Sequence, residues 1–330
     1  MEAIDRIAAD TRLSGVVRVD LGDEVAFAGA YGFANRAYAV PNTQDTQLAI
    51  ASGVKGMTAL TVVSLIEERL LALTTTARSV LGSDLPLIAD GVTVEHLLAH
   101  RSGIGDYLDE DVDSEIDDYM MPVPVHELRT TEQYLRVLDG HPPKFAPDER
   151  FSYCNGGYVL LALIAERVTG VSFPDLVGQR VCVPAGMHAT EFLESDALPA
   201  RAAVGYLGVD GDRTNVFHLP VRGNGDGGVY TTTADVHAMW NAVFGGGVVS
   251  QQWVQRMVRP RSHDPAQSLR YGLGFWLHDS RGIAMLEGYD AGVSFRTVHD
   301  PGRRITHTVI SNTSKGAWPI TRHLAEQLGT

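Results

Sequence analysis

Ser52 and Lys55 are the residues of this 330-residue chain whose types and spacing most directly suggest chemistry. Side chains three positions apart on a helix share a face and come within reach of each other. A desolvated lysine amine can lose its proton and then accept one from a serine hydroxyl, whereas a guanidinium effectively never does. Only three of the 27 basic residues are lysines. The pair predicts a serine activated for attack on a carbonyl, at a helix start whose free N–H groups favour developing negative charge.

A second pair, Tyr153 and Asn155, lies in the stretch FSYCNGGY. In extended backbone, residues two apart point to the same side, so a phenol and an amide could both face the cleft of Ser52. A phenol beside an ammonium can relay a proton. Taken alone, each pair could arise by chance, and Tyr153 alone would be read as a core aromatic residue. Both together favour a catalytic interpretation.

The elements that must position these residues follow from the hydrophobic pattern. Alternation over residues 14–40 predicts a hairpin, and apolar residues at three- and four-residue spacings predict a helix over 52–71. Alternation returns in the last third, before an amphipathic helix from about Trp318. Strands near both ends with helices between them predict an α/β fold in which distant chain ends share one antiparallel sheet and a helical subdomain is inserted.

Composition narrows the class of protein. A hydrophobic content of 44% with 20% charged residues is ordinary for a globular enzyme. The net charge of −13 offers no basic face, so neither nucleic acid nor a membrane surface is expected as a partner. The first 30 residues carry acids and arginines where a signal peptide needs an apolar run, which predicts a cytoplasmic protein. Cys154 and Cys182 fit no zinc spacing and are predicted to be buried thiols.

Three further motifs are interpreted as parts of the structure and not as ligand sites. His96 and His100 share a helical face in HLLAH, but the glutamate of a zincin is absent, so no metal is expected. GNGDGG at 223–228 follows no clear strand, which favours a loop with close backbone contacts over a dinucleotide site. The acidic stretch 106–118 carries eight carboxylates and is interpreted as a solvated loop, since the remaining alternative, a calcium loop, would need a glycine.

Ser-x-x-Lys followed by Tyr-x-Asn resembles the serine beta-lactamase and penicillin-binding protein superfamily, in particular its class C beta-lactamase, esterase and D-aminopeptidase branch. Residues 92–104, 145–170 and 225–240 resemble further blocks of that family, so the likeness covers nearly the whole chain. It implies one domain over residues 1–330, with an α/β part at about 1–75 and 220–330 and a mostly helical insertion at about 76–219. It also implies acyl transfer through a serine ester without a cofactor or metal.

The resemblance assigns roles residue by residue. Ser52 resembles the nucleophile, Lys55 the lysine that tunes it, Tyr153 the general base and later acid, and Asn155 the amide that orients the substrate. The third family motif is expected in LEGYDAGVSF, at Tyr289, Asp290 and Ala291. Gly292 would then donate its N–H to the oxyanion beside that of Ser52.

The expected activity is hydrolysis of an ester, amide or lactam carbonyl of a small molecule or short peptide. A carboxylate in the third motif would repel the carboxylate of a penicillin, so an esterase or D-amino amidase is favoured over an efficient beta-lactamase. The acidic stretch would favour cationic or neutral substrates if it overhangs the site. Water would be activated by Tyr153 or Lys55 in the second step. The alternatives are a weakly catalytic binding or sensor protein and a Ser-His-Asp esterase, for which no Gly-x-Ser-x-Gly elbow exists. The physiological substrate and the oligomeric state stay open.

Overall fold

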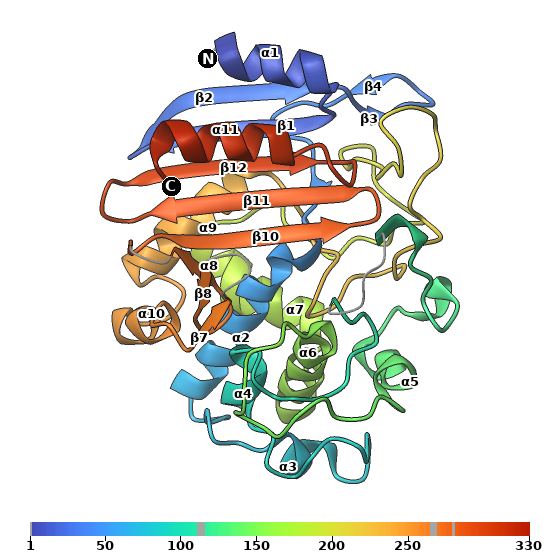
Figure 1. Ribbon diagram of the computed structural model, residues 1–330, viewed down its shortest axis with the longest axis vertical. Helices are drawn as coiled ribbons and strands as arrows, with labels where there is room; N and C mark the ends of the chain where they lie inside the picture. The colour runs from blue at the N-terminus through green and yellow to red at the C-terminus, as the bar shows by residue number, and fades with distance from the viewer. Residues whose placement is uncertain (1, 111–115, 265–268, 279–280) are drawn as a thin grey trace.

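The protein is built around one eight-stranded antiparallel sheet with helices on both faces (Figure 1). The computed structural model describes residues 2–110, 116–264, 269–278 and 281–330. The strand order is β2-β1-β12-β11-β10-β9-β8-β7. The strands are β1 Gly15–Leu21, β2 Glu24–Tyr31, β7 Ser262–Asp264, β8 Leu269–Tyr271, β9 Trp276–His278, β10 Ala284–Asp290, β11 Val293–Asp300 and β12 Ile305–Ser311.

The two ends of the chain meet in this sheet, as the sequence predicted. β1 pairs antiparallel with β12, from Gly15 opposite Ser311 to Leu21 opposite Ile305. The predicted hairpin at 14–40 is β1 and β2, joined by a turn in which Gly22 has φ +62°. This pairing places the C-terminal strands beside the N-terminal ones, so residues more than 230 positions apart can build one site.

One face of the sheet is covered by the terminal helices α1 Glu2–Thr11 and α11 Trp318–Leu328 (Figure 1). Both helices are amphipathic, and their apolar sides pack on β1 and β12 in a small separate core. That core contains Ile4, Ala8, Leu13, Val17, Val19, Val309, Ala317, Ile320 and Leu324.

The other face packs on the larger core, through which helix α2 Val54–Glu67 runs. Residues 54–65 of α2 are all buried, since the helix contacts the sheet on one side and α6 Asn155–Thr169 on another. Helices α9 Thr233–Gly245 and α10 Gln251–Met257 cover the rest of this face. A helix buried all round can carry a lysine deep into the protein.

Below the sheet in Figure 1 lie α3 Ala77–Leu81, α4 Val94–Leu98, α5 Leu135–Leu138, α7 Phe173–Val177 and α8 Val183–Ala185. The chain also forms the short helices η2 Ile116–Asp118, η3 Val125–Glu127, η4 Thr131–Tyr134 and η5 Gly178–Cys182. Two small ladders complete the fold, β3 Phe33–Asn35 with β4 Val40–Pro41, and β5 Leu48–Ala49 with β6 Tyr230–Thr231.

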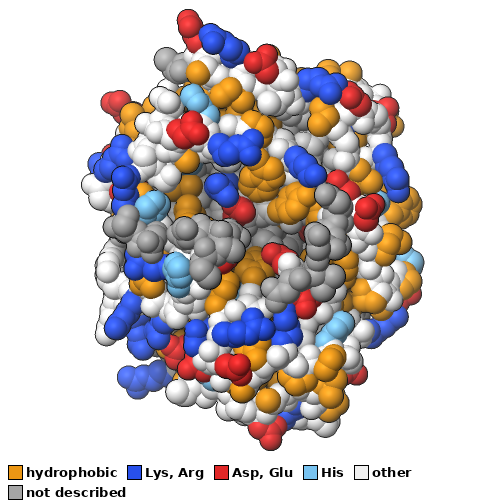
Figure 2. Space-filling view, in the orientation of Figure 1, with side chains coloured by type: hydrophobic (Ala, Val, Ile, Leu, Met, Phe, Trp, Pro, Cys, Tyr) orange, Lys and Arg blue, Asp and Glu red, His pale blue; other side chains and the backbone are white. Residues whose placement is uncertain are grey.

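Figure 2 shows acidic and basic side chains interspersed over this side of the molecule, with orange and red side chains at the hollow near its middle. Across the described ranges, no helix combines the length and the apolar character that a membrane crossing requires.

Candidate active site

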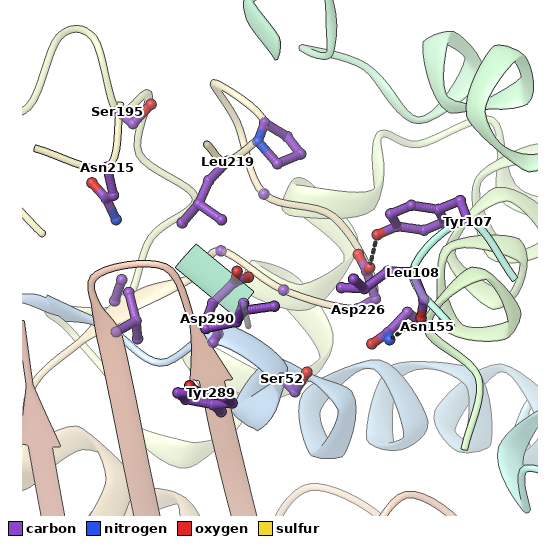
Figure 3. A pocket seen from close by; sticks show the side chains of 18 of the residues that line it. Ser52, Tyr107, Leu108, Asn155, Ser195, Asn215, Leu219, Asp226, Tyr289 and Asp290 are labelled. Carbon is purple, nitrogen blue, oxygen red and sulfur yellow. Dashed lines mark hydrogen bonds between the residues drawn. The ribbon is translucent and has the colours of Figure 1, made fainter. Parts of the chain in front are cut away.

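Ser52 lies in the 3₁₀ turn η1 Ala51–Gly53, which joins β5 to α2. The turn is sharp because Ala51 adopts φ +43°, a region that side chains other than glycine rarely occupy. Ser52 is partly exposed and lines a pocket of about 380 Å³ between the sheet and the helical region (Figure 3). The predicted placement of the serine at a helix start is confirmed.

Lys55 projects from the first turn of α2 toward Ser52 and is 2% exposed. Its Nζ lies 2.8 Å from Ser52 Oγ, 2.8 Å from Asn155 Oδ1 and 2.9 Å from the carbonyl oxygen of Asp226. Two of these three partners are carbonyl oxygens that can only accept, while the serine hydroxyl can also donate. A neutral amine would therefore give both of its protons to the carbonyls and keep its lone pair for the proton of Ser52.

Burial lowers the pKa of Lys55, because removing an ammonium from water disfavours the charged form. The carboxylates of Asp226 and Glu110 oppose this shift by attracting the ammonium. The effect of burial is the larger one, so at a given pH Lys55 is more often neutral than a solvent-exposed lysine is.

The ring of Tyr153 lies beside the Lys55 amine, and its centre is 4.9 Å from Lys55 Nζ. The ring is held between Trp276, stacked at 5.9 Å and 7°, and His100 at 4.3 Å. Burial raises the pKa of Tyr153 well above its ordinary value, and a hydrogen bond with the Ser52 side chain acts in the opposite direction. The phenol therefore stays protonated in the resting protein and has a proton to give.

Asn155 is the first residue of α6, so the extended backbone predicted for this stretch ends at Cys154. Its amide oxygen accepts from Lys55, and its Nδ2 donates to the carbonyl of Leu108 at 3.0 Å and to Glu110 at 3.3 Å. The start of α6 is capped by Asp106, whose carboxylate accepts from the N–H groups of residues 155 and 156. Asn155 is thus brought to Ser52 as predicted, but its amide positions the lysine and the rim of the pocket.

Asp226 is a site residue that was not predicted from the sequence. Its backbone carbonyl accepts from Lys55, and its buried carboxylate accepts a short hydrogen bond from the Tyr107 hydroxyl (Figure 3). It belongs to the glycine loop 223–228, whose close backbone contacts are confirmed, since a Cβ on Gly225 would lie 2.2 Å from the Tyr158 carbonyl oxygen. The signal in the sequence was a lone carboxylate among four glycines.

Strand β10 meets the Ser52 turn at Gly288. A Cβ on Gly288 would lie 2.0 Å from the Ile50 carbonyl oxygen and 3.1 Å from the N atom of Gly53, so the strand backbone touches the residues on both sides of Ser52. Leu286, on the same face of the strand, packs on Gly56 of α2. The backbone of Gly288 therefore packs directly on the Ser52 turn.

The predicted role of Gly292 needs correction for this reason. The buried N–H of Gly292 donates to Ser314 Oγ at 2.8 Å. It is therefore not available to an oxyanion formed at Ser52. Gly292 has φ +69° in the two-residue turn between β10 and β11, which explains the glycine by backbone geometry. Ala291 is buried in the same turn and its carbonyl accepts from Asn215.

Tyr289 and Asp290, predicted to bind substrate, both line the pocket. Their side chains leave opposite faces of β10, and Tyr289 packs edge-on against Trp318 of α11 at 6.0 Å. Asp290 points into the pocket in Figure 3. Burial raises the pKa of the Asp290 carboxyl to about 7, although a hydrogen bond from the Ala291 N–H favours its charged form.

The other motifs have structural roles. Cys154 and Cys182 are buried and free, as predicted. His96 completes the capping box of α4, and His100 packs against the rings of Tyr153 and Tyr158. Within the acidic stretch 106–118, residues 111–115 lie outside the described residues, and of the rest Tyr107, Leu108, Asp109, Glu110 and Ile116 line the pocket.

A family model described as beta-lactamase matches residues 2–328 of this chain. The chain belongs to the beta-lactamase family. A crystal structure of a penicillin-binding protein from Bacillus halodurans superposes with a TM-score of 0.92 at 34% identity, covering 98% of this chain and 99% of that one. The mixed α/β fold with a large antiparallel sheet is thus the fold of the family.

Curated relatives of this beta-lactamase family chain carry different names. Esterase EstB of Burkholderia gladioli is 34% identical over 61% of this chain and 52% of its own length. A D-aminopeptidase of Brucella anthropi is 28% identical over 81% of this chain and 49% of its own length. The chain therefore spans about half the length of these two relatives. They support a hydrolase without fixing its subtype.

Proposed function

We propose that the protein is a serine hydrolase that cleaves an ester or amide of a small molecule or short peptide through an acyl-enzyme on Ser52. The observation that carries this proposal is the environment of Lys55, whose Nζ lies 2.8 Å from Ser52 Oγ while its other two partners are carbonyl oxygens. Such an amine is arranged to take the hydroxyl proton as Ser52 attacks a carbonyl carbon.

Proton transfer is divided between two residues in this scheme. Lys55, whose pKa is lowered, acts as the base in the first step, and Tyr153, whose pKa is raised, donates a proton to the leaving group and regains one from Lys55. Water then attacks the ester on Ser52 and gives its proton to the same pair, which returns a proton to Ser52 Oγ as the acid product leaves. This differs from the expected role of Tyr153 as the first base, because a buried phenol without a charged donor stays protonated.

The backbone N–H groups of Ser52 and Tyr289 would hold the oxyanion. Asp290 pairs with Val293 at the end of the hairpin, so its backbone groups face β11. Successive residues of a strand point their backbone N–H and C=O groups to opposite edges, so the backbone groups of Tyr289 face the other edge of β10. That edge lies next to the contact of Gly288 with the Ser52 turn. Tyr289 therefore takes the role first given to Gly292.

An ester or amide is favoured over a beta-lactam by the charges at the end of β10. Leu286 and Gly288 carry no charge there, Glu287 is paired with Arg296, and Asp290 is a carboxylate that forms no ion pair with the described residues. The carboxylate of a penicillin would meet like charge in a partly desolvated pocket, which costs several kcal/mol. Relatives named as an esterase and a D-aminopeptidase support the same choice.

The test is replacement of Ser52 by Ala, with p-nitrophenyl butyrate and nitrocefin as substrates. Hydrolysis of the ester should be lost in the variant, and only the unaltered protein should be labelled at Ser52 by a fluorophosphonate. An active Ser52→Ala variant, or label on another peptide, refutes the assignment. Absence of both labelling and turnover in the unaltered protein would instead favour the binding or sensor alternative.

A further inference from the structure

The pocket at Ser52 is acidic. Five carboxylates are among its lining residues, and no Lys, Arg or His is among the described residues that line it. They are Asp109, Glu110, Asp226, Glu287 and Asp290. Apolar side chains from residues 193 and 219–221 also line it. A site with this lining is complementary to a ligand that has apolar surface and carries a positive charge.

Two of these carboxylates are neutralised by basic side chains of the protein. Asp109 accepts from Lys144 Nζ at 2.8 Å, and Glu287 forms an ion pair with Arg296. Asp226 is held by the hydroxyl of Tyr107 and lies next to Lys55, to which its carbonyl is bound. These three groups therefore have structural reasons for their positions.

Asp290 differs from them. The hydrogen bond that the structure gives its carboxylate comes from the N–H of Ala291, the next residue in the chain. Lys55 also acts on it through its charge, but Lys55 is already bound by Ser52, Asn155 and the Asp226 carbonyl. A carboxylate kept in a partly buried pocket costs free energy unless a cation or a donor meets it.

The position of Asp290 fixes where such a cation would lie. Asp290 follows Gly288 by two residues on the same face of β10, so it stands about 7 Å along the strand from the contact with the Ser52 turn. In Figure 3 its carboxylate points into the pocket on the side of Leu219, and Ser52 lines the same pocket. A positive group that meets Asp290 and a carbonyl carbon at Ser52 can then belong to one small acyl group.

We propose that Asp290 binds the ammonium group of the substrate, and that the preferred substrates are esters or amides of small amino acids with a free amine. This proposal rests on the proposed function, because it names the acyl group that Ser52 receives. Glu110 and Asp226, which face Lys55 and the same pocket, add to the negative potential, and Asp290 makes the direct ion pair. Asp290 would therefore decide specificity without taking part in proton transfer.

Pairs of substrates of equal shape test the proposal. The p-nitrophenyl esters of alanine, in both D and L forms, are compared with that of isobutyrate, in which a methyl group replaces the ammonium. The esters of 3-aminopropanoate and butyrate form a second pair in which the ammonium lies one bond further away. Each pair is measured as kcat/KM in conditions where the amine is protonated, for the unaltered protein, Asp290→Asn and Asp109→Asn.

The unaltered protein should prefer the cationic member of at least one pair by about tenfold or more, mostly through KM. In Asp290→Asn, kcat/KM on that ester should fall by about 10- to 100-fold relative to kcat/KM on the neutral one. Asp109→Asn removes the same charge from a carboxylate that already has Lys144, so it should change the preference much less.

Three results would overturn the proposal: a preference for the neutral esters in the unaltered protein, an unchanged preference in Asp290→Asn, or an equal loss in Asp109→Asn. Labelling of Ser52 by a fluorophosphonate in each variant shows that the nucleophile is intact. Failure of the proposed function is distinguishable, because it would abolish labelling and the hydrolysis of both members of each pair.

Discussion

Replacing Asp290 by Asn should stabilise the folded protein, and only at a pH where the carboxyl group would be ionised. Burial raises the pKa of Asp290 from its ordinary 3.8 to about 7 in the folded state. Between these values the folded protein binds more protons than the unfolded chain, so the stability of the unaltered protein falls as the pH rises through this window. Asparagine has the shape of the carboxyl group and no such ionisation.

The magnitude follows from the two pKa values. The difference between about 7 and 3.8, at about 1.4 kcal/mol per pKa unit, sets an upper limit of about 4 kcal/mol on the stabilisation above pH 7. Asp290 keeps part of its surface in solvent, which reduces the figure to about 2–4 kcal/mol. With an unfolding entropy of about 2.1 cal/mol/K per residue, 330 residues give about 0.7 kcal/mol/K, and the expected rise in Tm is about 3–6 °C.

The assay is thermal or denaturant unfolding of both proteins from about pH 4 to pH 8. The two should agree at the acid end and separate progressively as the pH rises, with the variant more stable. Asp10→Asn, at an exposed position on α1, controls for removal of one negative charge from a protein of net charge −13. A difference that is flat over this range, or that shrinks as the pH rises, would refute the assignment of Asp290 as a carboxylate that the fold holds at a cost.

Two further predictions concern the same site. Gly288→Ala would put a Cβ 2.0 Å from the Ile50 carbonyl oxygen and should lower kcat/KM by about 100-fold or more. The control Gly282→Ala, whose Cβ has no atom within 4 Å, should change kcat/KM little. Equal activities of the two variants would contradict the contact between Gly288 and the Ser52 turn. Asp226→Asn removes a carboxylate that raises the pKa of Lys55. The acid limb of the pH profile of kcat/KM on a neutral ester should therefore move to lower pH. A limb that stays in place or moves to higher pH would show that Lys55 is not the titrating base.

The nucleophile and its lysine could be predicted from sequence because their relation is local. A spacing of three residues on a helix fixes the distance between two side chains whatever the rest of the fold does. The approach of Tyr153 and Asn155 was also predictable in part, since it depends on a short segment that enters a helix. The terminal helix α1 Glu2–Thr11 was not recognised, although its apolar residues face the sheet at helical spacing.

The third segment of the site could not be located in the same way. Its place depends on the register of β10 against the Ser52 turn, a contact between residues more than 230 positions apart. Two glycines, Gly288 and Gly292, could each have marked a close approach of backbones. Only the structure shows that Gly292 is needed for its left-handed φ in a tight turn, while Gly288 is needed because a Cβ has no room.

The acidic lining of the pocket works against the chemistry that the Ser52 and Lys55 pair would perform on a neutral ester. Glu110, Asp226 and Asp290 each raise the pKa of Lys55 and so favour its protonated form, in which it cannot accept the proton of Ser52. A substrate ammonium at Asp290 would reverse this, because its charge offsets the carboxylate and lowers the pKa of Lys55 when the acyl group is in place. The carboxylates would then make the serine most reactive when an amine-bearing substrate is bound, which adds a smaller selectivity in kcat to the larger one in KM.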